Sequence, residues 1–542
     1  MRTCVLSRCF LPILFWGVAF ALSGGVDAQP LSFAGTGDDQ KSQTLLLFEQ
    51  PGEFRPHHRI DELLRDSLAQ KNMTPAPLCS DAVFVRRVYL DLIGTLPTVA
   101  EVRAFLDDTS PDKRNVLIDK LLDRPEFIDY WTMQWCDMLR VKAEFPINLW
   151  PNGALCYYNW IRDSVRTNKS YDQFAYELLT SNGSNFREGA ANFYRAAPEK
   201  NAETLAEAVA QTFLGMRTVS WREEKRADLT VFFSRVAYKD TAEWKEEIVY
   251  WDRRPLEKNM VTFPDGTQKL VEANVDLRTV FADWLIAPTN TLFSRYMANR
   301  VWFWLLGRGL VHEPDDFRDD NLPVHPEILD YLAAELVRSR YDIKHLLRLI
   351  ARSATYQQSS LVRGDATVAQ ELFAVYPIRR LEAEVLQDAL SMLFGRSSGY
   401  NSEVPEPFTF IPNRYRTVVL PDSGITSPFL EMFGRPTRDT GLTSDRNNRV
   451  TEAQQLFLIN STEVNTWVRT LSQNHVNRLR SRQNAAGVIV DELWLLLLSR
   501  LASPTESRLA TASIAPGGRL SEQKVQDLVW ALLNTDEFLC RH

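Results

Sequence analysis

Two clusters of side chains provide most of the chemistry in this sequence. The first is rich in arginine and asparagine and consists of Arg435, Arg438, Arg446, Asn447, Asn448 and Arg449. Guanidinium groups bind sulfate, carboxylate or phosphate through paired hydrogen bonds, and asparagine side chains bind hydroxyl groups. The cluster therefore predicts a site for an anion or a glycan. Replacing both Arg446 and Arg449 by alanine is expected to weaken binding of an anionic glycan and to leave the fold intact. The alternative is an internal network that pins an irregular loop, with Asp439 and Asp445 as partners.

The second cluster is acidic and follows a predicted helix. It contains Glu313, Asp315, Asp316 and Asp319, with His312 and Asp320 beside them. Carboxylates this close in sequence are able to share a hard cation such as Ca²⁺, although the central glycine and final glutamate of an EF-hand are missing. A solvated acidic loop that pairs with arginines is the commoner arrangement for such a composition. His345 falls opposite the apolar stripe of its helix, which predicts a solvated histidine.

Sequence motifs for several kinds of redox and metal chemistry are missing. The chain contains no CxxC, CxxCH or HExxH pattern. Covalent haem, thioredoxin-like exchange and zincin proteolysis therefore have no support in the sequence. We predict no bound cofactor other than the Ca²⁺ considered above.

The first 28 residues have the features of a secretory signal. Arg2 and Arg8 precede a short apolar run over residues 10–22, and Val26-Asp27-Ala28 fits the rule for cleavage after Ala28. The run is shorter than the ~20 residues that span a bilayer. We expect an exported protein of the periplasm or cell envelope, without a stable membrane span after cleavage. A retained membrane anchor is the alternative.

Charge and cysteine content narrow the possible partners. The formal net charge is −7 and becomes −8 once Arg2, Arg8 and Asp27 leave with the signal. A nucleic-acid partner normally requires a basic surface, so none is expected. The exported chain retains Cys79, Cys136, Cys156 and Cys540. They allow pairing of Cys136 with Cys156 and of Cys79 with Cys540, or four separate thiols.

Hydrophobic periodicity predicts a mainly α protein with two helical domains and a small β-hairpin segment between them. After the signal and a flexible lead-in at 29–56, the N-terminal domain covers 57–220, a connecting segment covers 221–275, and the C-terminal domain covers 276–542. Three helices and an acidic loop occupy residues 290–353. In the connecting segment, a short helix through 231–236 precedes a hairpin at 260–271 that turns at Pro264-Asp265-Gly266.

A series of segments resembles a known family. They are RRVYLDLIGTLPTVAEVRAFL at 86–106, YDQFAYELLTSNGSNFREGAANFYR at 171–195, NRVWFWLLGRGLVHEPDDFRDDN at 299–321, YDIKHLLRLIARSATYQQSS at 341–360, RRLEAEVLQDAL at 379–390, FGRPTRDTGLTSDRNNR at 433–449 and LLNTDEFLCRH at the end of the chain. Together they resemble secreted planctomycete-type proteins built from domain of unknown function 1549 followed by domain of unknown function 1553. The resemblance covers nearly the whole exported chain and implies no established activity.

Many relatives in this family carry a cytochrome c-like segment or a Cys-x-x-Cys-His motif near the end of the first domain. The corresponding segment here, at 214–229, contains neither cysteine nor histidine. The chain is therefore similar to a branch without the haem motif, marked by RDTGL and RNNR. Haem binding is not carried over to this chain.

Two functional hypotheses follow from these observations. The first is an envelope binding or scaffold protein, with secreted sulfatase-like proteins as companions that the resemblance suggests. The second is a hydrolase or lyase that acts on an anionic, sulfated polysaccharide. Tryptophans at 131, 135, 150 and 160 lie near a polar loop; core packing is the favoured interpretation of these rings, and a stacking platform for sugars is the other.

Overall fold

The computed structural model describes residues 45–143, 149–254, 260–395, 399–412, 415–479 and 484–542, all of which belong to one compact unit. The fold is mainly α, as predicted, and contains small antiparallel sheets of two or three strands. The proposed signal at 1–28 and the lead-in up to residue 44 lie outside the described residues. No helix in the described part of the chain has the length and apolar character needed to cross a bilayer.

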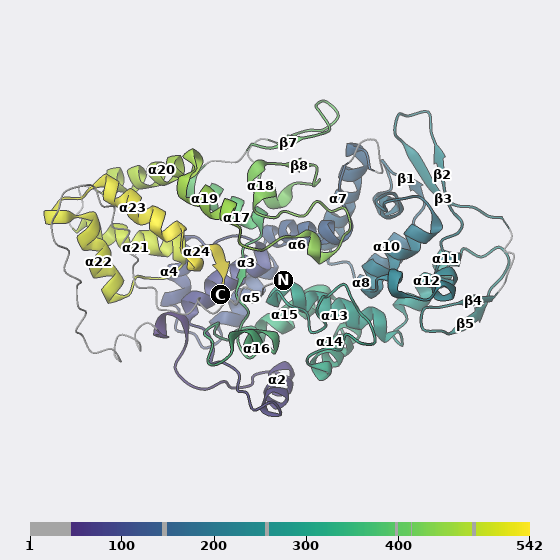
Figure 1. Ribbon diagram of the computed structural model, residues 1–542, viewed down its shortest axis with the longest axis horizontal. Coiled ribbons are helices and arrows are strands. Elements are labelled where there is room, and N and C mark those ends of the chain that lie inside the picture. The colour runs from purple at the N-terminus through teal and green to yellow at the C-terminus, as the bar shows by residue number, and fades with distance from the viewer. Residues whose placement is uncertain (1–44, 144–148, 255–259, 396–398, 413–414, 480–483) are drawn as a thin grey trace. The chain divides into compact units, whose positions relative to one another are not determined.

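The first half of the sequence is largely helical, and several of its helices pack on one another (Figure 1). Thr98 and Glu101 form the capping bonds that begin α4, as their spacing predicts. The helices are α2 (Arg59–Ala69), α3 (Asp81–Ile93), α4 (Val99–Asp107), α5 (Lys113–Leu122), α6 (Pro125–Met138), α7 (Pro151–Arg166), α8 (Tyr171–Thr180), α9 (Asn192–Arg195), α10 (Ala202–Leu214) and α11 (Glu223–Val231).

Strands are concentrated in the connecting segment. The predicted hairpin is confirmed as β4 (Met260–Thr262) and β5 (Gln268–Leu270), which pair in antiparallel register. The helix expected through 231–236 ends earlier, at Val231, and Val236 instead begins β2 (Val236–Asp240). This strand pairs with β3 (Glu247–Trp251), which also pairs with β1 (Gly183–Ser184). The sequence analysis missed this sheet because one of its strands is only two residues long and comes from a distant loop.

The second half of the chain is again helical, and its described residues contain four short strands. The predicted stretch at 290–353 is confirmed as α13, α14 and α15, with Asn290 and Asp342 as caps of the first and third. The helices are α12 (Leu277–Ile286), α13 (Thr291–Leu306), α14 (Pro326–Arg338), α15 (Ile343–Arg352), α16 (Ala366–Glu371), α17 (Ala383–Phe394), α18 (Pro428–Met432), α19 (Glu452–Asn460), α20 (Thr462–Leu479), α21 (Ala485–Leu498), α22 (Pro504–Ile514), α23 (Glu522–Leu533) and α24 (Asp536–Leu539). The strands are β6 (Arg379–Arg380), β7 (Asn401–Ser402) and β8 (Ile425–Thr426), together with β9 (Cys540–Arg541), which pairs with β6.

Helix α3 connects these two halves of the sequence. Nearly all of its side chains are buried, including two arginines that donate to carbonyl groups of the C-terminal half. Arg86 donates to the carbonyls of Leu497 and Phe538, both at 2.8 Å. Arg87 donates to the carbonyls of Tyr356 and Gln358 at 2.6 and 2.9 Å. Buried guanidinium groups need such acceptors, so the last turn of α21, helix α24 and the segment that follows α15 are held on α3.

Candidate functional site

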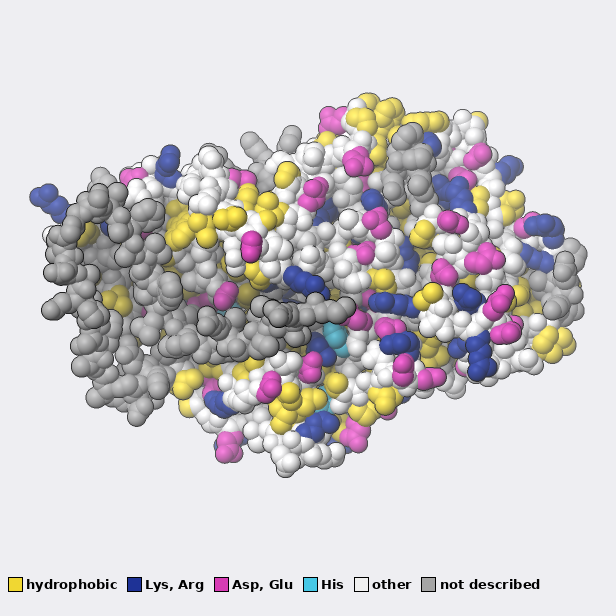
Figure 2. Space-filling view, in the orientation of Figure 1, with side chains coloured by type: hydrophobic (Ala, Val, Ile, Leu, Met, Phe, Trp, Pro, Cys, Tyr) yellow, Lys and Arg dark blue, Asp and Glu magenta, His cyan; other side chains and the backbone are white. Residues whose placement is uncertain are grey.

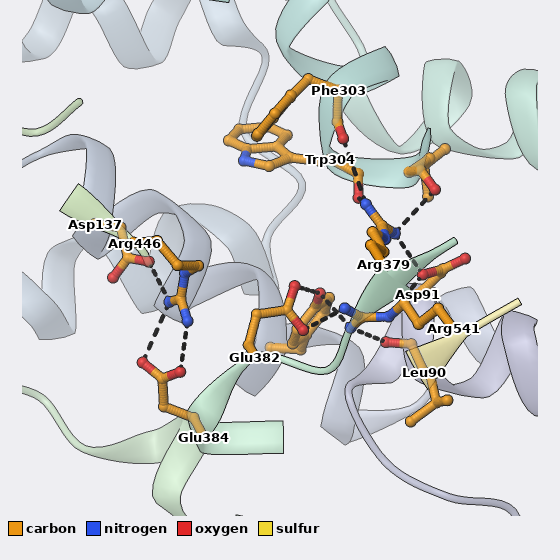
Figure 3. A network of polar contacts seen from close by, with 12 residues as sticks. Leu90, Asp91, Asp137, Phe303, Trp304, Arg379, Glu382, Glu384, Arg446 and Arg541 are labelled. Carbon is orange, nitrogen blue, oxygen red and sulfur yellow. Dashed lines mark hydrogen bonds and ion pairs between the residues drawn. The ribbon is translucent and has the colours of Figure 1, made fainter. Parts of the chain in front are cut away.

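The predicted arginine cluster is divided between the interior and the surface. Arg435, Arg438 and Arg446 point inward and meet two carboxylates, Asp137 at the end of α6 and Glu384 in α17. Figure 3 shows Arg446 between these two carboxylates. Arg446 contacts both carboxylates at 2.6 Å, and Arg438 Nε lies 2.8 Å from Asp137. We call these five residues the arginine clamp.

Electrostatics favour the ionised form of the clamp. Burial by itself raises the pKa of Glu384, but Arg446 and Arg435 lower it by more, and it lies at about 2. Glu384 therefore remains a carboxylate at neutral pH, and its charge is matched by the guanidinium groups around it. Because Arg446 is bound on both sides, replacing it is expected to disturb packing as well as any ligand, in contrast to the intact fold expected from the sequence.

The remaining residues of the predicted cluster lie outside the clamp. Asn447, Asn448 and Arg449 are exposed, and Asn447 Oδ1 accepts from the Arg449 N–H at 3.1 Å. The two aspartates expected as internal partners bond elsewhere. Asp439 accepts from Lys142 at 2.6 Å, and Asp445 accepts from the Thr440 hydroxyl at 2.8 Å.

A second buried charge network lies beside the arginine clamp (Figure 3). Asp91 of α3 lies 2.6 Å from Arg379 and 2.9 Å from Arg541. Arg541 also pairs with Glu382, and Tyr130 donates to the same glutamate at 3.3 Å. These groups fasten strands β6 and β9 to α3 and neutralise one another, so they have a structural role.

The acidic cluster does not gather into a cation site. Asp315 is buried, forms an ion pair with Arg300 and accepts from the backbone and hydroxyl of Thr443 at 2.7 Å. Asp316 pairs with Arg318 at 3.0 Å, while Glu313 and Asp319 are exposed. Across the described ranges, no group of three or more His, Cys, Asp or Glu side chains is arranged to hold a metal ion.

All four cysteines of the exported chain lie within the described residues. No disulfide joins Cys79, Cys136, Cys156 and Cys540, which agrees with the interpretation as separate thiols. Burial raises the pKa of the Cys136 thiol to about 12. A thiol with so high a pKa is a poor nucleophile and a poor metal ligand.

The serine-hydrolase spacing Gly-x-Ser-x-Gly was wrongly taken as absent from the sequence, and it occurs at 395–399. Gly395 is the left-handed C-cap of α17. The serine-hydrolase elbow requires a strand before the motif, which a helix does not supply. Residues 396–398 lie outside the described residues, and the motif supports no assignment.

The structure also contains a polar pocket that the sequence analysis missed. Its volume is about 510 Å³, which falls in the range of small-ligand sites. The lining residues are Gln50, His57, His58, Leu78, Asp81, Ser110, Pro111, Lys113, Arg114, Asn115, Arg352 and Gln357. They come from the N-termini of α2, α3 and α5 and from the C-terminus of α15, so no short stretch of sequence contains the site.

Charges in the polar pocket are unbalanced. Lys113, Arg114 and Arg352 line it against one carboxylate, Asp81, which leaves two formal positive charges. Lys113 and Arg114 each lie 2.8 Å from Asp81. Burial alone raises the pKa of Asp81, but these two contacts lower it below its ordinary value, so Asp81 stays ionised. The positive ends of three helix dipoles add to this excess, and the negative end of α15 opposes it in part.

Arg352 also pairs with Asp119, outside the pocket, and Asp119 is shared with Arg348. Counting Arg348 and Asp119 together with the pocket adds one cation and one carboxylate, so the excess of two positive charges is unchanged. Arg352 Nε is buried and has no hydrogen-bond partner. The polar pocket is therefore a local basic site on a chain whose overall charge is negative.

Of the four tryptophans expected to pack in the core, Trp131 and Trp135 do so, while Trp160 is partly buried. Trp131 and Trp135 are 2% and 5% exposed, and both rings contact Trp304 edge to face. Trp160 packs against Phe174 with a centroid distance of 4.8 Å. Trp131 and Trp135 therefore offer no open face to a sugar.

Fold and site together define a mainly α protein with buried charge networks and one polar pocket at converging helix ends. Residues 59–220 match PSCyt2, a protein of unknown function (DUF1549), and residues 277–514 match PSD1, a protein of unknown function (DUF1553). The chain belongs to the family in which the first domain is followed by the second, as the resemblance indicated. Neither the curated proteins nor the solved structures include a significant match to the chain.

Proposed function

We propose that the protein is an exported binding protein of the cell envelope whose polar pocket binds an anionic group of a polysaccharide. The observation that supports this proposal is the excess of cations in the pocket. Arg114 and Arg352 supply charge-assisted donors for a sulfate ester or a carboxylate. Lys113 adds positive charge, while its three donors bind Asp81 and the carbonyls of Phe105 and Asp108. Ser110 and Asn115 lie in the same lining and are suited to hydroxyl groups.

Binding is favoured over cleavage because of the carboxylates available. Glycoside hydrolysis generally uses two carboxyl groups, one of which acts as an acid and the other as a base or nucleophile. Among the described lining residues, Asp81 is the one carboxylate, and two cations hold it in the ionised form. The proposal of export comes from the sequence of residues 1–28, and a secreted sulfatase-like protein is a further partner consistent with the same compartment.

The test compares two arginines of the same helix. Arg352 and Arg348 are both 31% exposed in their side chains and both pair with Asp119, but Arg352 lines the pocket and Arg348 does not. A sulfated galactan hexasaccharide and its desulfated form are titrated calorimetrically into the wild type, Arg352→Met and Arg348→Met. Loss of one charge-assisted hydrogen bond is expected to weaken binding of the sulfated sugar ~10-fold or more in Arg352→Met.

Arg348→Met should bind the sulfated sugar like the wild type, and the desulfated sugar should bind weakly to all three proteins. Equal binding by Arg352→Met and the wild type would remove the pocket from consideration. Equal losses in the two variants would assign the effect to Asp119 and the packing of α15. Shortened sugar after incubation would favour the hydrolase or lyase.

A further inference from the structure

Three aromatic side chains from distant segments form a cluster at the surface. Trp150 precedes α7, Trp244 lies in the turn between β2 and β3, and Phe408 lies in the segment between β7 and β8. The Trp150 ring meets Trp244 edge to face at 4.7 Å and Phe408 at 5.6 Å, and Trp244 lies 5.6 Å from Phe408. Each ring therefore contacts the other two, and we call the three residues the aromatic triad.

The triad combines an ordered arrangement with high exposure. Trp150 is 9% exposed and forms the base, while Trp244 and Phe408 are 58% and 47% exposed. Phe410 is 73% exposed, and the buried Thr409 between the two phenylalanines indicates that both rings face outward. Figure 2 shows hydrophobic side chains gathered along the upper edge, where Figure 1 places the β2–β3 turn and the segment after β7. Exposed rings held by one another are typical of binding surfaces.

The size of the surface distinguishes between classes of partner. A buried aromatic side chain covers roughly 150–250 Å², so the exposed parts of Trp244, Phe408 and Phe410 amount to roughly 400 Å². A stable protein interface needs about 800 Å² from each partner. The aromatic surface is therefore too small for a protein partner by itself, and it is suited to a few rings of a small ligand.

Polar groups beside the rings carry charges of both signs. Glu243 and Lys245 flank Trp244, and Arg187 lies 3.7 Å from Glu243. Glu403 and Glu406 precede Phe408 and are exposed. Acidic groups at this edge disfavour a polyanion or an anionic bilayer. A sugar hydroxyl group both donates and accepts hydrogen bonds. A rim that contains carboxylate acceptors and cationic donors is therefore suited to sugar hydroxyl groups.

From this geometry we propose that the aromatic triad, together with Phe410, is a stacking subsite for an uncharged sugar chain. The flat C–H face of a pyranose ring lies on the exposed face of Trp244, and its outward hydroxyl groups reach the mixed rim. The sequence analysis considered a sugar platform at tryptophans 131, 135, 150 and 160, whereas the stacking subsite proposed here lies at the β2–β3 turn. Trp150 is the one residue that the two sets share. This subsite is separate from the polar pocket and does not depend on its anionic ligand.

The test uses two uncharged oligosaccharides, chitohexaose and cellohexaose. Each is titrated into the full chain while tryptophan emission and heat are recorded. We expect saturable binding of at least one sugar, weakened ~10-fold or more in Trp244→Ala and restored in part by Trp244→Phe, since stacking on an aromatic face contributes ~1–3 kcal/mol. Trp221→Ala is the matched control, because both tryptophans are exposed at least in part and each has a lysine over its ring. Lys245 lies 5.8 Å from the Trp244 centroid, and Lys225 lies 4.2 Å from the Trp221 centroid.

Failure to bind either sugar, or equal binding by Trp244→Ala and the wild type, would overturn the proposal. So would Trp244-dependent capture on phosphatidylglycerol vesicles without sugar binding, which would assign the rings to a membrane surface. Arg352→Met should bind the uncharged sugars normally. The outcome at the triad is therefore independent of the outcome at the pocket.

Discussion

Replacing Glu384 by glutamine removes one charge from the arginine clamp and keeps the size of the side chain. Glu384 is fully buried and serves two guanidinium groups, with Arg446 at 2.6 Å and Arg435 at 3.5 Å. In Glu384→Gln, Arg446 keeps Asp137 as its remaining carboxylate. We expect the free energy of unfolding to fall.

Two physical arguments agree on the size of this loss. Removing one partner of a buried ion pair costs about 3–5 kcal/mol, since the other charge stays buried without compensation. The pKa of Glu384 is about 2, against an ordinary value of 4.5, because the two arginines outweigh the effect of burial. A difference of that size corresponds to roughly 3 kcal/mol of stabilisation of the folded state. We therefore expect a loss of about 3 kcal/mol at pH 7.

The same argument predicts how the loss depends on pH. The pKa is lower in the folded than in the unfolded state, so the stabilisation is fully present above pH 4.5 and disappears as the pH falls toward 2. Urea unfolding followed by tryptophan emission, from pH 7 to pH 2.5, measures the difference between the wild type and Glu384→Gln. The difference should be largest at pH 7 and should narrow below pH 4.5.

Asp439→Asn is the matched control, because it breaks an exposed pair with Lys142 in the same segment. Exposed ion pairs contribute about 0–1 kcal/mol, so this variant should stay close to the wild type. The reasoning is refuted if Glu384→Gln loses less than about 1 kcal/mol at pH 7, or if its deficit is independent of pH.

Two further predictions concern Asp388 and Gly434. Burial raises the pKa of Asp388 from 3.8 to about 6, so the folded protein holds this proton after the unfolded chain has released it, and stability falls as the pH rises through that window. Thermal unfolding between pH 4 and pH 7 should lose this slope in Asp388→Asn, and an unchanged slope would contradict the assignment. Gly434 has φ +85°, and a Cβ there would lie 1.9 Å from the Asn447 carbonyl oxygen. Gly434→Ala should therefore lower the urea midpoint by the equivalent of about 3 kcal/mol or more, and a midpoint near that of the wild type would show that the 434–447 contact can relax.

Features encoded by neighbouring residues were predicted well. The helices at 290–353 and the capping bonds of Thr98 and Glu101 depend on spacings of three or four residues, which are visible in the sequence. The β4–β5 hairpin is equally local, because its turn residues lie between its strands. The β1–β3–β2 sheet escaped prediction because β1 is too short to have a pattern of its own.

Partners of charged side chains could not be predicted in the same way. Arg446 was expected to find Asp439 or Asp445, yet its carboxylates are Glu384 and Asp137, which lie 62 and 309 residues away in sequence. Sequence proximity favours a partner only when the side chains face each other. Asp445 instead bonds to Thr440 within its own loop.

The sequence by itself determined the family, the mainly α fold and most helix positions, because periodicity and capping are properties of adjacent turns. It also indicated which residue types were available for binding. Only the tertiary structure decided that three of the predicted arginines are used internally, that helix ends bring Lys113, Arg114 and Arg352 around one pocket, and that Trp244 rests on Trp150 at the surface. The physical reason is that burial and electrostatic pairing depend on distances in space, which packing of remote segments sets.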